Sequence, residues 1–261
     1  MSPPSDLGPF EGSGMYYSRG RPGYGTNTIA YVADRFGLDA GTRVLDLGCG
    51  TGQLAIPLSG YAGDVVALDP SESMIAAGRQ QATTAGVTDI EWIVGSDTEI
   101  GPELGPLRLT TIGRAFHWVD QERTLDRLRE ITEDNGGVAI FDDPEWLTQG
   151  QEPWQRAIYT VVDDFLDLPE RTVPADIEYE NPWDELLAER GFSDVEVVTF
   201  DHHREWDLEL IVAYVFSLSF VDFEAIGDVE ALEADVRERL SEFDSQLFSQ
   251  KSEVTVISGR V

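Results

Sequence analysis

The residues best arranged for chemistry form one short run, Val44-Leu45-Asp46-Leu47-Gly48-Cys49-Gly50-Thr51-Gly52. Three glycines alternate with other residues, directly after an apolar segment that is typical of a buried strand. Such a turn favours glycine because a Cβ would block both the backbone conformation and the close approach of a ligand. A helix is expected to begin directly after the turn, and its free N–H groups would suit a carboxylate or a phosphate. The run therefore predicts a ligand-binding loop.

The spacing of the glycines limits the kind of ligand. A dinucleotide fingerprint needs Gly-x-Gly-x-x-Gly, whereas Gln53 stands at the sixth position here. An acid, Asp69, closes the next expected strand, and one carboxylate can accept hydrogen bonds from both hydroxyls of a ribose. Strand, Asp-x-Gly-x-Gly-x-Gly, helix, strand and terminal acid, in this order, predict a nucleoside ligand rather than a purely structural turn.

This run and two further segments resemble class I S-adenosylmethionine-dependent methyltransferases, specifically the small-molecule type-11 group that includes trans-aconitate methyltransferase-like proteins. Tyr17 to Tyr24 matches the pattern Tyr-x-x-x-Arg-Pro-x-Tyr, and Ala115 to Asp120 matches Ala-x-His-Trp-x-Asp at the end of the fourth strand. The resemblance covers residues 16–145 well and the C-terminal half only in outline.

The resemblance implies S-adenosylmethionine as the cofactor. The glycine loop would face the methionine moiety, with Asp46 near its amino group, and Asp69 would hold the ribose. Arg21 would pair with the methionine carboxylate, a bidentate task to which a guanidinium is suited. The expected cofactor-binding residues are Tyr17, Arg21, Asp46, Gly48, Gly50, Gly52, Asp69, Met74, Ser96, Asp97 and Phe116.

Some of these residues have a competing structural interpretation. Met74 packs either against the adenine or in the core of its helix. The adenine-reading segment is expected at Gly95-Ser96-Asp97, and whether Ser96 or Asp97 meets the exocyclic amine stays open. Arg21 would otherwise be an ordinary surface arginine.

The acceptor is expected to bind beside the end of the fourth strand. Methyl transfer from a sulfonium needs an aligned nucleophile, exclusion of water and, for some acceptors, removal of a proton. His117 is the candidate catalytic base, and a hydrogen-bonded histidine beside the cofactor is the competing interpretation. The residues expected to line the substrate are Trp118, Arg114 and Tyr24. His202 and His203 lack cysteine or acidic partners at metal-ligand spacing, so no metal is predicted.

One further segment, Asp142-Asp-Pro-Glu-Trp146, resembles the Asp-Pro-Pro-Tyr motif of nucleic-acid amino-methyltransferases. It follows the fifth expected strand rather than the fourth and lacks the second proline. We interpret the likeness as accidental.

The elements that position these residues alternate as strand and helix between Arg43 and Asp142, which predicts a parallel sheet with helices on both faces. We expect an α/β, Rossmann-like fold: a seven-strand, mostly parallel sheet with an antiparallel last strand and a helical cap. Residues 1–261 would form a single methyltransferase domain, with a core of about 25–145, 182–200 and 253–261. Cap insertions at about 146–181 and 201–250, rich in aromatic residues, would roof a cavity of ~300–1,000 Å³.

The charge of the chain is anomalous. The formal net charge is −31, and Lys251 is the single lysine among 18 basic residues. This composition predicts a halophilic protein, because screening in concentrated salt shortens the reach of self-repulsion. It disfavours nucleic-acid partners, which need clustered Lys and Arg. A lone cysteine, Cys49, and no visible signal peptide or membrane span predict a cytoplasmic location; the oligomeric state is not predicted.

The sequence thus predicts transfer of a methyl group to an oxygen, nitrogen or carbon of a small molecule, such as an organic acid or a hydroxyl compound. Two alternatives stay open. One is a methyltransferase acting on a protein or a nucleic acid. The other is a non-catalytic S-adenosylmethionine-binding protein that interacts through its acidic cap.

Overall fold

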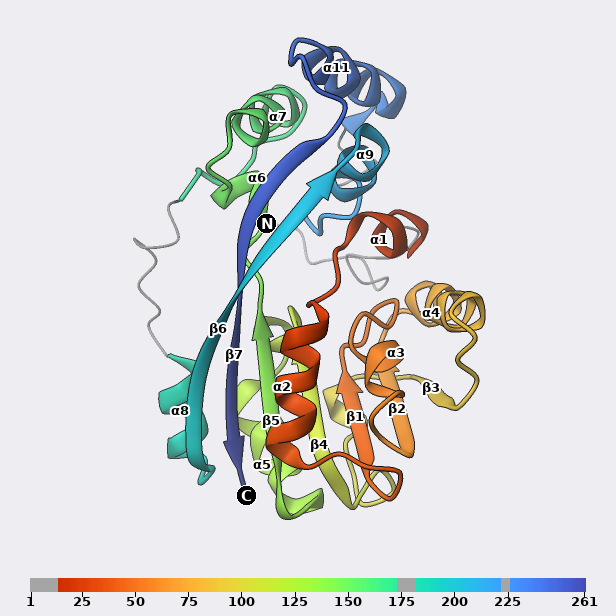
Figure 1. The fold of residues 1–261 in the computed structure, drawn as a ribbon, viewed down its shortest axis with the longest axis vertical. Coiled ribbons are helices and arrows are strands. Elements are labelled where there is room, and N and C mark those ends of the chain that lie inside the picture. Colours follow the sequence, from red (N-terminus) through yellow and green to blue (C-terminus); the bar gives the residue numbers. More distant parts are fainter. Residues whose placement is uncertain (1–13, 173–181, 222–225) are drawn as a thin grey trace.

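The computed structural model describes residues 14–172, 182–221 and 226–261, and its centre is a seven-stranded sheet in the order β3-β2-β1-β4-β5-β7-β6 (Figure 1). The strands are β1 (Arg43–Leu47), β2 (Asp64–Asp69), β3 (Ile90–Val94), β4 (Leu107–Gly113), β5 (Thr132–Asp142), β6 (Ser193–Trp206) and β7 (Phe248–Arg260). Strands β1 to β5 pair in parallel, and β7 is antiparallel to both of its neighbours. The predicted fold class, with its antiparallel last strand, is confirmed.

Helices cover both faces of the parallel strands. The face with α2 (Thr26–Phe36), α3 (Ala55–Leu58) and α4 (Glu72–Thr84) buries one apolar cluster. The opposite face, with α5 (Gln121–Ile131) and α8 (Trp183–Glu189), buries a second. Because both faces are covered, β1 and β2 are almost continuous apolar runs, and Asp46 and Asp69 are the acids within or ending them.

The remaining described helices gather beyond the carboxyl ends of the parallel strands (Figure 1). They are α1 (Gly14–Gly20), α6 (Trp146–Gln149), α7 (Pro153–Asp163), α9 (Leu208–Val215) and α11 (Val229–Ser241). Their apolar side chains form a third cluster centred on Trp146, Trp154, Trp206 and Tyr214. These aromatic rings pack against one another, with Trp146 stacked on Tyr214 at 4.4 Å between centroids. These four aromatic residues of the expected cap therefore pack in its core.

The cap differs from expectation where the last two strands enter it. Strand β6 continues to Trp206 and β7 begins at Phe248, so residues 201–206 and 248–252 form a two-stranded ribbon rather than cap helices. Residues 1–13, 173–181 and 222–225, which include parts of both expected cap insertions, lie outside the described ranges. Within those ranges, no helix is long and apolar enough to cross a membrane.

Candidate cofactor and acceptor site

The glycine loop leaves β1 at the carboxyl edge of the sheet and turns sharply. Gly48 has φ +67°, and a Cβ there would lie 2.4 Å from Ala115 Cβ, so the loop and the segment after β4 pack too closely for any side chain at this position. The N–H groups of Gly48 and Cys49 both donate to Leu68 O, at 2.8 and 3.1 Å. The end of β2 thereby fixes the position of the loop.

Asp69 is the acid that meets this loop. Its Oδ2 accepts from Gly50 N at 2.8 Å and its Oδ1 from Ser71 N at 2.9 Å. Burial raises the pKa of Asp69, and these two N–H groups act in the opposite direction. A carboxylate has about four acceptor sites, so both oxygens keep capacity for a further donor. The residue is 8% exposed, and this arrangement fits the two hydroxyls of a ribose.

Asp46 lies beneath the loop. Its Oδ2 accepts from Ala55 N at 2.9 Å, and its Oδ1 accepts from the Thr111 hydroxyl at 3.1 Å. Burial raises the pKa of Asp46 to about 7 against these two hydrogen bonds, and nearby Asp69 raises it further. The carboxyl group thus joins the start of α3 to β4 and holds the shape of the loop. Its predicted contact with a methionine amino group stays a prediction.

Several N–H groups of the glycine loop form hydrogen bonds within the protein, so few remain for a ligand. Besides the N–H groups already named, Gly52 N donates to Cys49 O at 2.9 Å. Helix α3 spans only Ala55–Leu58, and its first N–H is taken by Asp46. The expected row of free N–H groups at a helix start is therefore largely used within the protein.

Helix α1 covers the loop from above. A Cβ on Gly50 would lie 3.2 Å from Tyr17 Cε1, so the Tyr17 ring lies over the loop. The Arg21 guanidinium lies 5.3 Å from the centre of the Tyr17 ring and 5.1 Å from that of Tyr214. Its Nη2 donates to Ser217 O at 3.3 Å, whereas its buried Nε has no partner among the described residues. Arg21 is thus a half-buried residue above the loop, with its Nε turned away from solvent.

The residues expected near the adenine lie at the ends of β2 and β3. Met74 is 2% exposed on α4. Ser96 caps a single 3₁₀ turn, accepting from Thr98 N at 3.2 Å and donating to Glu99 Oε2 at 3.0 Å. Asp97 Oδ2 accepts from the Thr124 hydroxyl at 3.3 Å. The structure therefore gives both Ser96 and Asp97 partners within the protein.

In the segment after β4, Phe116 is buried, whereas its neighbours His117 and Trp118 are exposed. Phe116 has no exposed surface and meets Trp183 edge-to-face in the core on the α5 side, with centroids 5.4 Å apart. The side chain of Phe116 thus packs in the core, and its expected contact with the cofactor stays a prediction. Trp118 is 56% exposed, and its ring lies 5.0 Å from that of His117. Partial desolvation lowers the pKa of His117, which favours a neutral imidazole.

Arg114 and Tyr24, both expected to line the substrate, lie together. The guanidinium of Arg114 lies 4.9 Å from the centre of the Tyr24 ring, which is 4% exposed. Arg114 also forms an ion pair with Asp143, whose side chain is 1% exposed. Arg204 binds the same carboxylate through two hydrogen bonds of 3.0 Å.

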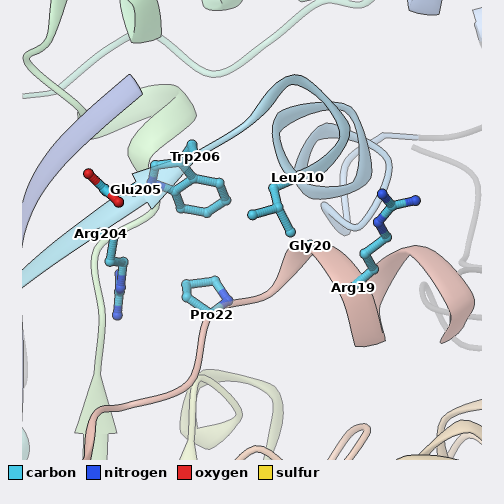
Figure 2. Close-up of a pocket in the computed structure, with 7 residues that line it drawn as sticks. All are labelled: Arg19, Gly20, Pro22, Arg204, Glu205, Trp206 and Leu210. Atoms are coloured by element: carbon cyan, nitrogen blue, oxygen red, sulfur yellow. The ribbon is translucent and has the colours of Figure 1, made fainter. Parts of the chain in front are cut away.

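Arg204 also borders a small hollow of about 230 Å³ between the end of α1, the end of β6 and α9 (Figure 2). This hollow is smaller than the cavity expected beneath the cap.

Two acids after β5, Asp143 and Glu145, were not among the candidate site residues. Glu145 stands at the N-cap of α6 without a capping hydrogen bond, and its Oε1 is buried with no partner among the described residues. Burial raises the pKa of Glu145 to about 7, although Arg21 and Arg114 lower it. The position of Asp-Asp-Pro-Glu at the carboxyl end of a buried strand was the available signal, since open α/β sheets bind ligands there.

Known proteins that are similar to this chain are methyltransferases. The family described as "Methyltransferase domain" matches residues 44–136. An uncharacterized methyltransferase of Mycobacterium bovis, Mb3374, is 29% identical over 147 residues, which is 56% of this chain and 55% of the relative. Demethylmenaquinone methyltransferase of Shouchella clausii is 30% identical over 109 residues, 40% of this chain and 46% of the relative. The chain spans about half the length of these curated relatives.

Among solved structures, the fold is similar to that of an S-adenosylmethionine-dependent methyltransferase from Thiobacillus denitrificans in complex with S-adenosyl-L-homocysteine. The TM-score is 0.52 at 17% identity, and the match covers 94% of this chain and 95% of that one. The sheet order is that of the class I methyltransferase fold, and residues 44–136, which contain the glycine loop and its terminal acid, match the methyltransferase domain family.

Proposed function

We propose that this protein transfers a methyl group from S-adenosylmethionine to a small-molecule acceptor, an organic acid or a hydroxyl compound. The observation that carries the proposal is the cover over the carboxyl edge of the sheet. Tyr17 lies over the glycine loop, and Arg21 is enclosed between Tyr17 and Tyr214. A covered edge suits a metabolite better than a duplex or a folded protein, which need an open surface.

The cofactor would be held by the residues around the loop. Gly48, Gly50 and Gly52 would cradle the methionine part, and Asp69 would accept both ribose hydroxyls. Arg21 would pair with the methionine carboxylate through its unpartnered Nε. Met74, Ser96 and Asp97 remain the candidates beside the adenine. The bound cofactor supplies an activated methyl group, so the chain's own residues must align the acceptor and exclude water.

On the acceptor side, Arg114, Tyr24, Trp118 and His117 surround the end of β4. His117 keeps two candidate roles, that of a base and that of a residue beside the cofactor. The narrower relationship to trans-aconitate methyltransferase-like proteins rests on the segments 17–24 and 115–120, and an acidic acceptor would follow from it.

The remaining proposals concern the whole chain. We also propose a single-domain organisation, a salt-adapted surface and a cytoplasmic location, which the acidic composition and the lone cysteine support. A net charge of −31 disfavours a nucleic-acid acceptor.

The test is incubation with S-adenosylmethionine labelled in its methyl group and a cell extract separated by size. Label in the small-molecule fraction is the expected result. Label in protein or nucleic acid would favour the macromolecular alternative. Tight binding of the cofactor without label in any fraction would favour a non-catalytic binding protein.

A further inference from the structure

The segment Asp142-Asp-Pro-Glu145 enters the acceptor side of the site and has no role in the proposed function so far. Its first buried acid is fully engaged, because Asp143 is bound by Arg114, by Arg204 and by the Ser252 hydroxyl at 3.2 Å. The two guanidinium groups and the hydroxyl occupy the hydrogen-bond acceptor sites of the Asp143 carboxylate, so it has no capacity left for a ligand. Asp143 therefore positions the two arginines.

Glu145 is in the opposite state. Its Oε1 is buried and has no partner among the described residues, although Arg21, Arg114 and Tyr214, from three other parts of the chain, are near enough to interact with its charge. Leaving a buried carboxyl oxygen without a donor costs free energy. The Tyr214 hydroxyl accepts from Trp146 N at 3.1 Å, so the backbone beside Glu145 is held in place. Glu145 Oε1 is thus a hydrogen-bond acceptor held in place, and a ligand could supply its donor.

The position of Glu145 links it to the cofactor loop. Tyr17 lies over Gly50, Arg21 lies against both Tyr17 and Tyr214, and Tyr214 is bonded to the residue that follows Glu145. The strand order also places the end of β5 two strands from β1, on the same carboxyl edge. An acceptor molecule beside the methyl group would lie between these strand ends.

We propose that Glu145 is a catalytic residue that binds the nucleophilic hydroxyl group of the acceptor and takes its proton. This inference rests on the proposed function and narrows its acceptor class to hydroxyl compounds. A carboxylate acceptor carries no proton to remove and would be repelled by an ionised Glu145. A protonated amine would meet the cations of Arg21 and Arg114, whereas a neutral hydroxyl meets neither penalty.

In the proposed step, the acceptor hydroxyl donates a hydrogen bond to Glu145 Oε1. The hydroxyl oxygen forms its bond to the methyl carbon as the carbon–sulfur bond breaks, and the bonding pair of electrons stays on sulfur. The hydroxyl proton passes to Oε1 and then to solvent. Burial raises the pKa of Glu145 to about 7, which suits a base that works near neutral pH.

Three variants, two of Glu145 and one control, test this assignment. Glu145→Gln is expected to lower turnover ~100-fold, the usual contribution of a positioned base, while its affinity for S-adenosylhomocysteine stays within twofold of wild type. Glu145→Asp should recover part of the rate. Glu152→Gln, which changes the N-cap of the next helix, should stay within a fewfold of wild type. The wild-type rate should rise with pH through about 7, and the residual rate of Glu145→Gln should not.

A readout without turnover supports or opposes the same assignment. Above pH 7 an ionised Glu145 is a buried charge without a donor, so Glu145→Gln should melt at a higher temperature than wild type, and Glu152→Gln should not. A large loss of S-adenosylhomocysteine affinity in Glu145→Gln would overturn the proposal and assign the residue to the cofactor. Wild-type turnover in Glu145→Gln would overturn it as well.

The labelled product identifies the acceptor group even before the acceptor is known. Incubation uses methyl-labelled S-adenosylmethionine and the small-molecule filtrate of a cell extract, and the product is then treated with mild alkali. A methyl ether should keep its label in mild alkali and release it as methyl iodide in hot hydriodic acid, whereas a C-methyl group would keep its label in both. Release of labelled methanol would reveal an ester, and binding of the label to a cation exchanger would reveal an amine; either result contradicts the hydroxyl assignment alone. A wild-type protein that labels no small molecule would instead contradict the proposed function itself.

Discussion

At the scale of single residues, the site depends on carboxyl groups in unlike surroundings. Asp69 lies at the end of β2 with both oxygens bonded to backbone N–H groups and still able to accept. Asp46 is 1% exposed, and its two oxygens accept hydrogen bonds from Ala55 N at the start of α3 and from the Thr111 hydroxyl on β4. Glu145 has a buried oxygen without a donor. Asp69 is therefore suited to bind sugar hydroxyls, Asp46 stabilises the loop, and Glu145 is suited to bind an acceptor molecule.

The first prediction concerns Asp69. Asp69→Ala should weaken binding of S-adenosylmethionine and of its demethylated product by ~2–4 kcal/mol, because two ribose hydroxyls lose a charged acceptor. Calorimetry with the demethylated product measures this loss. Asp69→Asn keeps one oxygen and the volume, so it should lose less. Equal affinity in wild type and Asp69→Ala would show that the nucleoside lies elsewhere.

The second prediction concerns pH and Asp46. Burial raises its folded-state pKa to about 7 from 3.8, so between these values the folded state holds a proton that the unfolded state has lost. The free energy of unfolding of the ligand-free protein should therefore fall through this group as the pH rises from about 4 to about 7. Urea unfolding of wild type and Asp46→Asn at several pH values isolates this group from the general charge. Parallel pH profiles for the two proteins would show that Asp46 keeps its ordinary pKa.

At the scale of elements, helix α1 joins the two halves of the molecule. Gly20 at its end lies against α9, where a Cβ would lie 2.4 Å from the carbonyl carbon of Ala213. On its other side, the Gln81 side chain of α4 donates to Ser18 O at 3.3 Å. The cover over the cofactor loop is thus held by close backbone packing at one end and a side-chain hydrogen bond at the other.

The third prediction follows from that packing. Gly20→Ala should force α1 away from α9, lower the melting temperature by a clash worth ~1–3 kcal/mol and weaken S-adenosylhomocysteine binding, because Tyr17 and Arg21 move with the helix. Gly23→Ala is the matched control, since a Cβ there has no atom within 4 Å. Calorimetry and thermal unfolding of both variants decide it. Identical behaviour of the two alanine variants would show that α1 does not depend on this contact.

The elements near the glycine motif were predictable, whereas those of the cap were less so. Strands at 43–47, 64–69 and 90–94 agree with the structure, because strands buried on both faces appear as apolar runs. The continuation of β6 to Trp206 was missed, since alternating charged residues such as His203 and Glu205 resemble a solvent-exposed segment. Glu145 was missed because only its surroundings, not its type, distinguish it from a surface acid.

At the scale of the whole molecule, charge is distributed unevenly. The net charge is −31, yet Arg21, Arg114 and Arg204 gather around Asp143 and Glu145 at the acceptor side. Elsewhere arginines pair with acids at the surface, as Arg190 does with Asp126 and Glu122. Such exposed pairs contribute little to stability in salt. The acidic groups of the surface therefore repel one another, whereas the three arginines at the acceptor side outnumber the two acids that they meet.

The fourth prediction concerns this self-repulsion. Raising the KCl concentration from low to molar values shortens the screening length to ~3 Å, so the melting temperature should rise steeply. Scanning calorimetry in KCl and in NaCl separates general screening from a specific ion effect, since screening predicts similar curves. A flat melting temperature across the range would leave the acidic composition without this explanation.

The ribbon of β6 and β7 has a mechanical consequence. Its pairing runs without a register shift from Glu196 with Ser258, in the sheet, to Trp206 with Phe248, inside the cap. Because the two strands share main-chain hydrogen bonds along this whole length, the ribbon resists bending where it leaves the sheet. The cap that it enters is therefore expected to move together with the sheet rather than independently of it.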